Sequence, residues 1–194
     1  MERLHVKTFE QFIEDDKVEE KSGTAHDYGC VMLYLNVDEK NWADLQESID
    51  DEDVYEKDGD YGREDEPHVT VLYGLHEDND DDDIKKAMMA HEFSDPIVSM
   101  QRLSLFENDD FDVLKFDVNS KDLNKMNETL AEFPHTTDYP DYHAHCTVAY
   151  LKPGTGKKYA KKLKEAVVSK PDKIVYSKTD GSKLKWPFKK AKNE

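Results

Sequence analysis

Two short segments of the chain repeat one pattern, in which a histidine is followed two positions later by a threonine inside an apolar run. His68 and Thr70 form the first copy (HVTV), and His145 and Thr147 form the second (HCTV). Alternate side chains of a β-strand point to the same face, so each histidine should share a strand face with its threonine. The pattern predicts two strands that each present one imidazole and one hydroxyl to the same side.

Such a set of side chains favours the cleavage of a phosphodiester. One imidazole can activate the nucleophile and the other can protonate the leaving oxygen, because the pKa of histidine lies near neutrality. The two hydroxyls can donate to the nonbridging oxygens and stabilise the developing charge. We therefore predict that His68, Thr70, His145 and Thr147 are catalytic, although the pattern does not say which histidine is the base. The alternative is a pair of histidines at strand edges without a catalytic role.

Three further residues are candidates for substrate binding. Tyr34 belongs to the strand expected before the first motif and could stack on a base, or it could be an ordinary edge tyrosine. His143 shares a face with His145 by alternation, with a solvated loop histidine as the alternative. Tyr142 could line the mouth of a cleft.

We expect neither a metal nor a cofactor, because no set of residues has the spacing of a zinc or two-metal site. The two cysteines, Cys30 and Cys146, each lie inside an apolar run. That setting is typical of reduced core cysteines.

Composition limits the classes of partner. The net charge is -17, which argues against a nonspecific binder of duplex nucleic acid. The charge is uneven, since the segment from Lys152 to Glu194 holds 14 lysines against 4 acidic residues. No apolar run approaches the roughly 18 residues of a membrane span, so we expect a cytoplasmic protein without a membrane partner.

The chain should form one domain behind a tail. Residues 1–26 contain a short amphipathic piece, Leu4–Ile13, and then a charge run with nothing to bury, so we expect a tail, with a leader peptide as one interpretation of it. Residues 27–190 should form the domain. An acidic loop from Asp50 to Glu66 should precede the first motif strand.

The domain should alternate strands and helices. Expected strands are 30–37, 68–73 (ending at Gly74), 97–106, 113–118, 145–151, 174–177 and 184–188, and expected helices are 41–49, 80–90, 120–133 and 157–168. By strict alternation, Tyr73 and Tyr150 should face the core. The order strand, helix, motif strand, helix occurs twice, which predicts a bilobal α+β domain with both motif strands facing one cleft.

Both motifs and the repeated order resemble the two-histidine phosphoesterase superfamily, which includes RNA 2',3'-cyclic phosphodiesterases and RNA-ligase-like enzymes. The resemblance covers roughly residues 27–190. It implies a pseudo-symmetric fold with two antiparallel sheets facing a central cleft, and it implies the four motif residues as the catalytic set. The acidic loop and the lysine-rich end have no counterpart in that family.

A narrower resemblance comes from Tyr28–Leu35 and Leu151–Tyr159, which are similar to phage-encoded members such as the anti-CBASS phosphodiesterases. It implies a small nucleotide substrate, a cyclic di- or trinucleotide signal, cleaved at a 3'-5' linkage by 2'-hydroxyl attack in the host cytoplasm. Three alternatives remain open: processing of RNA ends that carry 2',3'-cyclic phosphates, binding of nucleotides without cleavage, and an acidic interaction protein.

Overall fold

The computed structural model describes residues 18–21, 26–57, 60–93, 95–137, 141–160 and 167–188. The strands are β1 (Val18–Lys21), β2 (Gly29–Asn36), β3 (Glu56–Lys57), β4 (Asp60–Tyr61), β5 (His68–Leu75), β6 (Val98–Glu107), β7 (Asp112–Asn119), β8 (His145–Leu151), β9 (Val167–Ser177) and β10 (Ser182–Pro187). The α-helices are α2 (Glu39–Glu47), α3 (Asp81–Met88), α4 (Lys121–Leu130) and α5 (Lys157–Ala160), with short 3-10 turns at Asp51–Asp53 and His91–Phe93.

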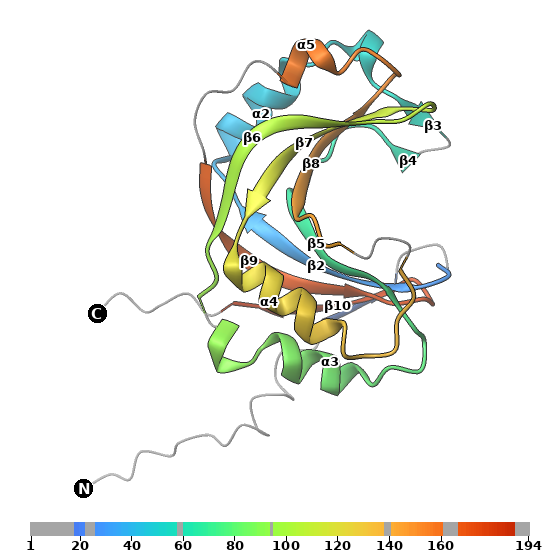
Figure 1. Cartoon of the computed structure of the whole chain (residues 1–194), viewed down its shortest axis with the longest axis vertical. Helices are drawn as coiled ribbons and strands as arrows, with labels where there is room; N and C mark the ends of the chain where they lie inside the picture. The colour runs from blue at the N-terminus through green and yellow to red at the C-terminus, as the bar shows by residue number, and fades with distance from the viewer. Residues whose placement is uncertain are drawn as a thin grey trace, which may run out of the picture.

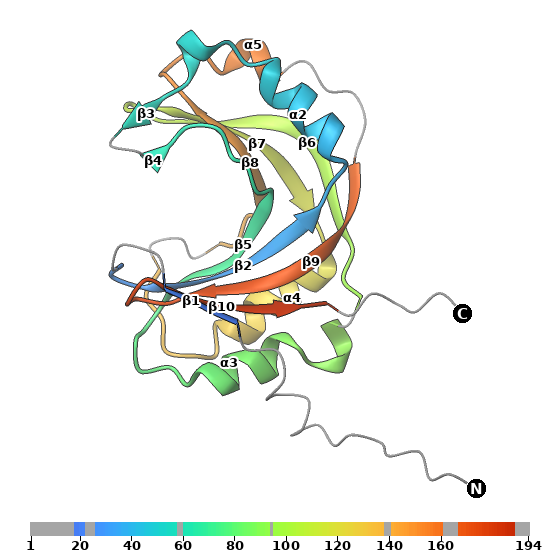
Figure 2. The same ribbon diagram turned by 180° about the vertical axis from the view of Figure 1, so that it is seen from behind.

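Eight of these strands form one sheet in the order β1-β10-β9-β2-β5-β8-β7-β6, in which β9 also pairs with β6, and β3 and β4 form a separate two-stranded sheet. The pairings of the larger sheet are antiparallel. The sheet bends into a C shape whose two arms are seen edge-on in Figure 1 and from behind in Figure 2. The predicted α+β class is confirmed. The two expected sheets are the two arms of this one sheet. The arms join at one pair between the motif strands, Val69 and Cys146, and again where β9 pairs with β6.

Each arm with its covering helices forms a lobe. The His68 lobe holds β1, β10, β9, β2 and β5, with α3 and α4 outside them, and the His145 lobe holds β8, β7 and β6, with α2 and α5 outside (Figures 1 and 2). The helices begin at residues whose side chains accept from first-turn amides, namely Asp38, Asp80 and Ser120. Apolar residues on the inner faces of these helices are buried against the outer face of the sheet, as with Leu123, Met126 and Leu130.

The segment that leads into each motif strand packs on the opposite lobe. Helix α2 precedes β5 in the chain, yet its Gln46 side chain binds the main chain of Val148 in β8. Helix α4 precedes β8, yet its Asn127 side chain binds the main chain of Val71 in β5. The two halves of the repeated order therefore exchange their helices.

The loops after these two helices continue the exchange. The acidic loop pairs with the far end of β8, through bridges from Val54 to Leu151 and from Arg63 to Ala149. In the same way, the loop after α4 pairs with the far end of β5, through a bridge between Leu75 and His135. Both motif strands thus have partners on both edges, although they pair with each other at only one position.

Several predicted element boundaries differ from the structure, and two of the differences have a clear physical cause. The helix expected over 157–168 does not extend that far, because Val167 already begins β9 and pairs with Met100 of β6. Strand β5 does not stop at Gly74 but runs to Leu75. Gly74 has a φ of 113°, and a Cβ at this position would overlap the carbonyl of Thr136 on the neighbouring loop.

The segment expected as a tail contains a strand, since Val18–Lys21 forms β1 and pairs with β10. The amphipathic piece Leu4–Ile13 lies outside the described residues. No helix among the described residues is long and apolar enough to cross a membrane.

Candidate active site

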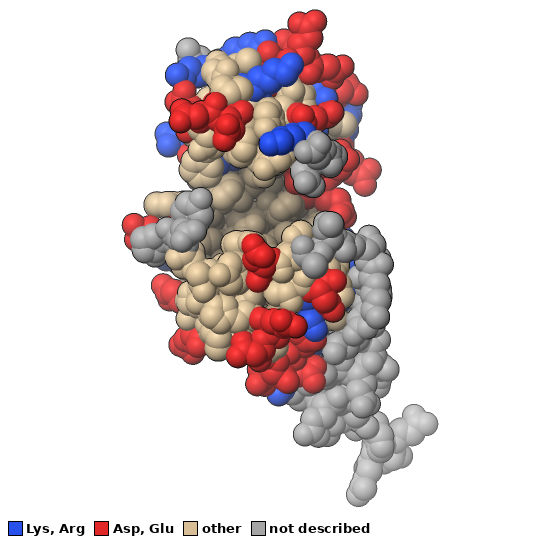
Figure 3. Space-filling model, turned by 90° about the vertical axis from the view of Figure 1, so that its right-hand side faces the viewer, with Lys and Arg blue, Asp and Glu red and all other residues tan. Residues whose placement is uncertain are grey.

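The two motif strands bring their polar side chains to one face of the sheet. Val69 pairs with Cys146, and continuing this antiparallel register by one residue places His68 opposite Thr147 and Thr70 opposite His145. All four side chains are half-buried, whereas Val69 and Cys146 between them are fully buried on the other face. This face is the inner face of the C. Figure 3 looks towards its opening and shows a hollow between the two lobes, surfaced mostly by uncharged residues.

Both imidazoles are fixed by the same local hydrogen bond. Nδ1 of His68 lies 2.9 Å from the carbonyl oxygen of Glu66, and Nδ1 of His145 lies 2.9 Å from that of His143. A carbonyl oxygen only accepts, so Nδ1 carries the proton in each ring. In the neutral state, Nε2 of each histidine therefore keeps a lone pair that can accept a proton.

Each motif strand has a β-bulge at the same place, three residues after its histidine. The pairing of β2 with β5 skips Val71, and the pairing of β7 with β8 skips Val148. A side-chain amide from the exchanged helix holds each bulge, since Asn127 donates to the Val71 carbonyl at 2.7 Å and Gln46 to the Val148 carbonyl at 2.8 Å. The repeated order that the sequence shows thus extends to a shared irregularity of the backbone.

The bulges overturn one prediction from alternation. Tyr73 and Tyr150, expected in the core, are on the same face as the histidines. Tyr73 pairs across the sheet with Cys30, whose neighbours on that face are Met32 and Tyr34. A bulge places two successive residues on one side, so every later side chain changes face. Tyr73 accordingly is 51% exposed.

Aromatic and acidic groups surround His68. The imidazole of His68 stacks on the ring of Tyr34, with centroids 5.2 Å apart. The ammonium of Lys173, on the neighbouring strand β9, lies 4.8 Å from the centroid of the Tyr34 ring. Burial raises the pKa of Tyr34 to about 12, so its hydroxyl stays protonated. The Glu64 carboxylate lies 3.8 Å from Nδ1 of His68. Tyr34, a predicted binding residue, therefore lies beside the motif histidine.

The surroundings of His145 contain a buried cation. Phe106 meets its ring edge-on with centroids 5.1 Å apart, and Lys115 lies 4.1 Å from the Phe106 centroid. The Lys115 ammonium is bound to Asp117 at 2.5 Å and to Ser104 at 2.9 Å. Burial lowers the pKa of His145, and the charge of Lys115 lowers it further.

Three of these neighbours were missed by sequence reasoning. Glu64 belongs to the acidic loop, where nothing distinguishes it from the other carboxylates. Phe106 stands at the end of a strand and has no special neighbours in the sequence. Lys115 did carry a signal, because it interrupts the apolar run of β7 at a position that is buried. A lysine in such a strand indicates a paired or functional cation.

The other two predicted binding residues contact the motif strands through the main chain. The Tyr142 hydroxyl donates to the Thr70 carbonyl at 2.8 Å, and its side chain packs against the core. His143 is exposed, and its carbonyl is the acceptor for His145. Both residues therefore help to position the motifs.

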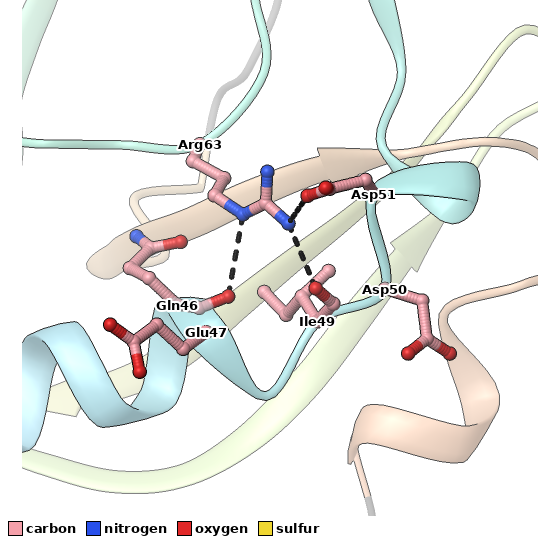
Figure 4. A pocket seen from close by; sticks show the side chains of 6 residues that line it. All are labelled: Gln46, Glu47, Ile49, Asp50, Asp51 and Arg63. Carbon is pink, nitrogen blue, oxygen red and sulfur yellow. Dashed lines mark hydrogen bonds and ion pairs between the residues drawn. The ribbon is translucent and has the colours of Figure 1, made fainter.

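A pocket of about 470 Å³ lies away from the histidines, between α2, the 3-10 turn and the acidic loop (Figure 4). Its guanidinium, from Arg63, donates to the carbonyls of Gln46 and Ile49 and to the Asp51 carboxylate. The Nε and Nη2 donors of Arg63 are thus used within the fold. No group of three or more potential metal ligands occurs within the part of the chain that the structure describes.

Comparisons with known proteins agree with this geometry. The model of the 2'-5' RNA ligase superfamily matches residues 37–175, a span that holds both motifs. Usb1 of Kluyveromyces marxianus has a similar structure, with a TM-score of 0.56, 11% identity, and coverage of 83% of this chain and 98% of that one. Its structure with uridine monophosphate gives a TM-score of 0.53 at 12% identity, with the same coverage.

At these identities, the solved structures establish the fold alone. No curated protein matches the chain by sequence. The family model covers most of the chain and includes both histidine strands. The chain therefore belongs to the 2'-5' RNA ligase superfamily and is a phosphodiesterase of the two-histidine type.

Proposed function

We propose that the chain cleaves 3'-5' linkages between ribonucleotides without a metal ion, using His68 and His145 as the acid–base pair. The observation that carries this proposal is the equivalent placement of the two imidazoles. Each has Nδ1 tied to a carbonyl two residues back, and each stands on the inner face beside the single pair that joins the motif strands. A phosphorus atom between the two rings would have a proton acceptor on one side and a proton donor on the other.

In the first step, Nε2 of His145 removes the proton of a ribose 2'-hydroxyl. The 2'-oxygen attacks the adjacent phosphorus, the bond to the 5'-oxygen breaks, and protonated His68 gives its proton to that leaving oxygen. The products are a 2',3'-cyclic phosphate and a free 5'-hydroxyl. In the second step, water opens the cyclic phosphate with the roles reversed. Thr70 and Thr147 donate to the nonbridging oxygens in both steps.

The surroundings of the two rings support this assignment of roles. His145 lies beside a buried cation and is half-buried, so its neutral form is favoured and it is ready to accept a proton. His68, the proposed acid, has the Glu64 carboxylate 3.8 Å from Nδ1 as a neighbour of opposite charge to an imidazolium.

We propose a cyclic di- or trinucleotide signal as the substrate, as cleaved by the phage-encoded anti-CBASS members of the superfamily. The resemblance of Tyr28–Leu35 and Leu151–Tyr159 to those members supports this choice. A protein of the same fold binds uridine monophosphate, which supports a small nucleotide ligand. Processing of RNA ends with 2',3'-cyclic phosphates is the second candidate, and it is favoured by the family match.

The deciding experiment incubates the purified protein in EDTA with a panel of substrates. The panel holds cyclic di- and trinucleotides, their 2'-deoxy analogues, and a short RNA ending in a 2',3'-cyclic phosphate. We expect cleavage of the ribose rings, with phosphate on the 3' side of the product, and survival of the deoxy rings. Cleavage of the deoxy analogues or loss of activity in EDTA would refute the scheme. Activity on the RNA end alone would establish the second candidate.

A further inference from the structure

Each motif strand carries a tyrosine five residues after its histidine and on the same face. In the His68 lobe this residue is Tyr73, and in the His145 lobe it is Tyr150. The face is fixed by the cross-strand pairs, because Tyr73 pairs with Cys30 and Tyr150 pairs with Val113, two positions from Lys115 on the histidine side of β7. Since β5 and β8 are antiparallel, the two tyrosines lie on opposite sides of the histidine pair.

Other aromatic rings gather around each tyrosine. In the His68 lobe, Tyr28 meets Tyr73 edge-on at 6.0 Å between centroids, and His76 stacks with Tyr28 at 6.0 Å. Tyr73 itself is 51% exposed. We call Tyr28, Tyr73 and His76 the first aromatic platform.

The second aromatic platform consists of Tyr55, Tyr61, Phe111 and Tyr150. Tyr61 contacts Tyr150 at 5.0 Å and Phe111 at 5.1 Å, and Tyr55 contacts Tyr61 at 5.4 Å. Tyr61 is 46% exposed and has a φ of 70°. The left-handed backbone of a non-glycine residue costs on the order of 1 kcal/mol in conformational free energy. The fold therefore holds this partly exposed ring in place at some cost to its stability.

We propose that the two platforms bind nucleobases of the substrate on either side of the cleaved linkage. This inference rests on the proposed function, because the phosphorus is taken to lie between His68 and His145. Every base has a π-face, and stacking on an aromatic side chain is the usual means of holding single-stranded bases. The two platforms occupy corresponding places in the two lobes, one on each side of the linkage.

The spacing of the platforms sets the size of the ligand. Each tyrosine lies five residues of strand from its histidine, roughly 16 Å at about 3.3 Å per residue. The two tyrosines lie in opposite directions from the histidine pair, so the path along the strands between the platforms is roughly 30 Å. Bases that reach both platforms therefore belong to nucleotides beyond those at the linkage. A linear strand of several nucleotides meets this requirement, whereas a dinucleotide does not bridge the lobes.

The test uses one variant in each platform and substrates of increasing length. The variants are Tyr73→Ala and Tyr61→Ala, with Tyr73→Phe and Tyr61→Phe as matched controls that keep the ring. The substrates are a linear dinucleoside monophosphate, a linear pentaribonucleotide, a cyclic dinucleotide and a cyclic trinucleotide. Steady-state cleavage is measured for all four, and binding of the uncleavable 2'-deoxy pentamer is measured by calorimetry.

We expect each alanine variant to raise KM for the pentamer about 10-fold, in line with the loss of one base–aromatic stack, and to leave the dinucleoside monophosphate within twofold. The phenylalanine variants should behave as the unmodified protein does. An effect on the cyclic trinucleotide equal to that on the pentamer identifies a ring among the ligands, and an effect on the pentamer alone identifies a linear strand.

Two results would overturn the inference. One is an equal loss on short and long substrates, which would indicate damage to the site as a whole. The other is unchanged binding of the deoxy pentamer to both alanine variants. The calorimetric measurement needs no turnover, so it tests base binding by the platforms even if no substrate in the panel is cleaved. Absence of cleavage would refute only the proposed function.

Discussion

The two lobes share a backbone plan but differ in the charges around their histidines. In both, the motif strand bears a bulge three residues after the histidine, and in both a lysine lies over an aromatic ring that touches the imidazole. Beside His68, however, lies the carboxylate of Glu64, whereas the charges that act on His145 include the salt-bridged pair of Lys115 and Asp117. A duplicated scaffold can thus hold two chemically distinct histidines.

The largest effect is expected from removing the two imidazoles one at a time, which tests whether both lobes are needed for turnover. We expect His68→Ala and His145→Ala each to lower turnover by about two to four orders of magnitude, the usual loss for a general acid or base. Both side chains face the hollow, so the circular dichroism spectrum should be unchanged. Near-normal turnover in either variant would show that the histidine of that lobe is not required for catalysis.

Removing the threonine hydroxyls tests whether the two lobes also contribute equivalent hydrogen-bond donors. Thr70→Val and Thr147→Val keep the shape of the side chain and remove the donor. We expect each to lower kcat about 100-fold while KM changes little, because donors to a developing oxyanion act mainly in the transition state. A change confined to KM would mean that the hydroxyls bind the ground state instead.

The electrostatic difference between the lobes can be tested by pH. Lys115→Met removes a cation that lowers the pKa of His145, so that pKa should rise. A base must be unprotonated, so the acidic limb of the kcat/KM profile should move to higher pH. Burial, the larger cause of the lowering, is retained in this variant.

Lys173→Met is the matched control, because Lys173 holds the corresponding place over Tyr34 in the other lobe. It should leave the acidic limb in place. If Lys173→Met moves that limb and Lys115→Met does not, the roles of the two histidines are the reverse of those proposed.

The smallest expected effects concern the amides that hold the bulges. Asn127→Leu and Gln46→Met each leave a bulge carbonyl without its donor, and we expect a loss of about 1 to 3 kcal/mol in the free energy of unfolding. Gln46→Met should have the larger effect, since Gln46 also donates to the Glu64 carbonyl. Chemical denaturation measures both values. Equal stability of both variants and the unmodified protein would show that the bulges need no side-chain support.

Much of the fold could be predicted because the strands that matter are locally encoded. Strand β8 begins and ends where the apolar run of the second motif does, and Ser120 was correctly expected to start a helix. The class of the fold and the phosphodiesterase activity are confirmed, and the catalytic roles of the motif residues remain predictions.

The parts that failed depend on contacts distant in sequence. Tyr73 and Tyr150 changed face because alternation cannot reveal a bulge, which here is held by amides from helices of the other half. Val167 joined a strand that pairs with Met100, a partner that no local pattern near residue 167 could indicate. Glu64 is close to His68 because Gln46 and the edge of β8 fix the end of the acidic loop.

The exchange of lead-in segments between the lobes affects how the protein can fold. Strand β5 obtains its second edge partner only when the loop containing His135 has been synthesised, some sixty residues later in the chain. Neither half can complete its hydrogen bonding alone, so a chain cut between β6 and β7 should give two fragments that each expose an unpaired strand edge. Most contacts that close the sheet are far apart in sequence, which favours slow folding. The inner face with both imidazoles needs segments from both halves of the chain, so we expect neither fragment alone to bind substrate.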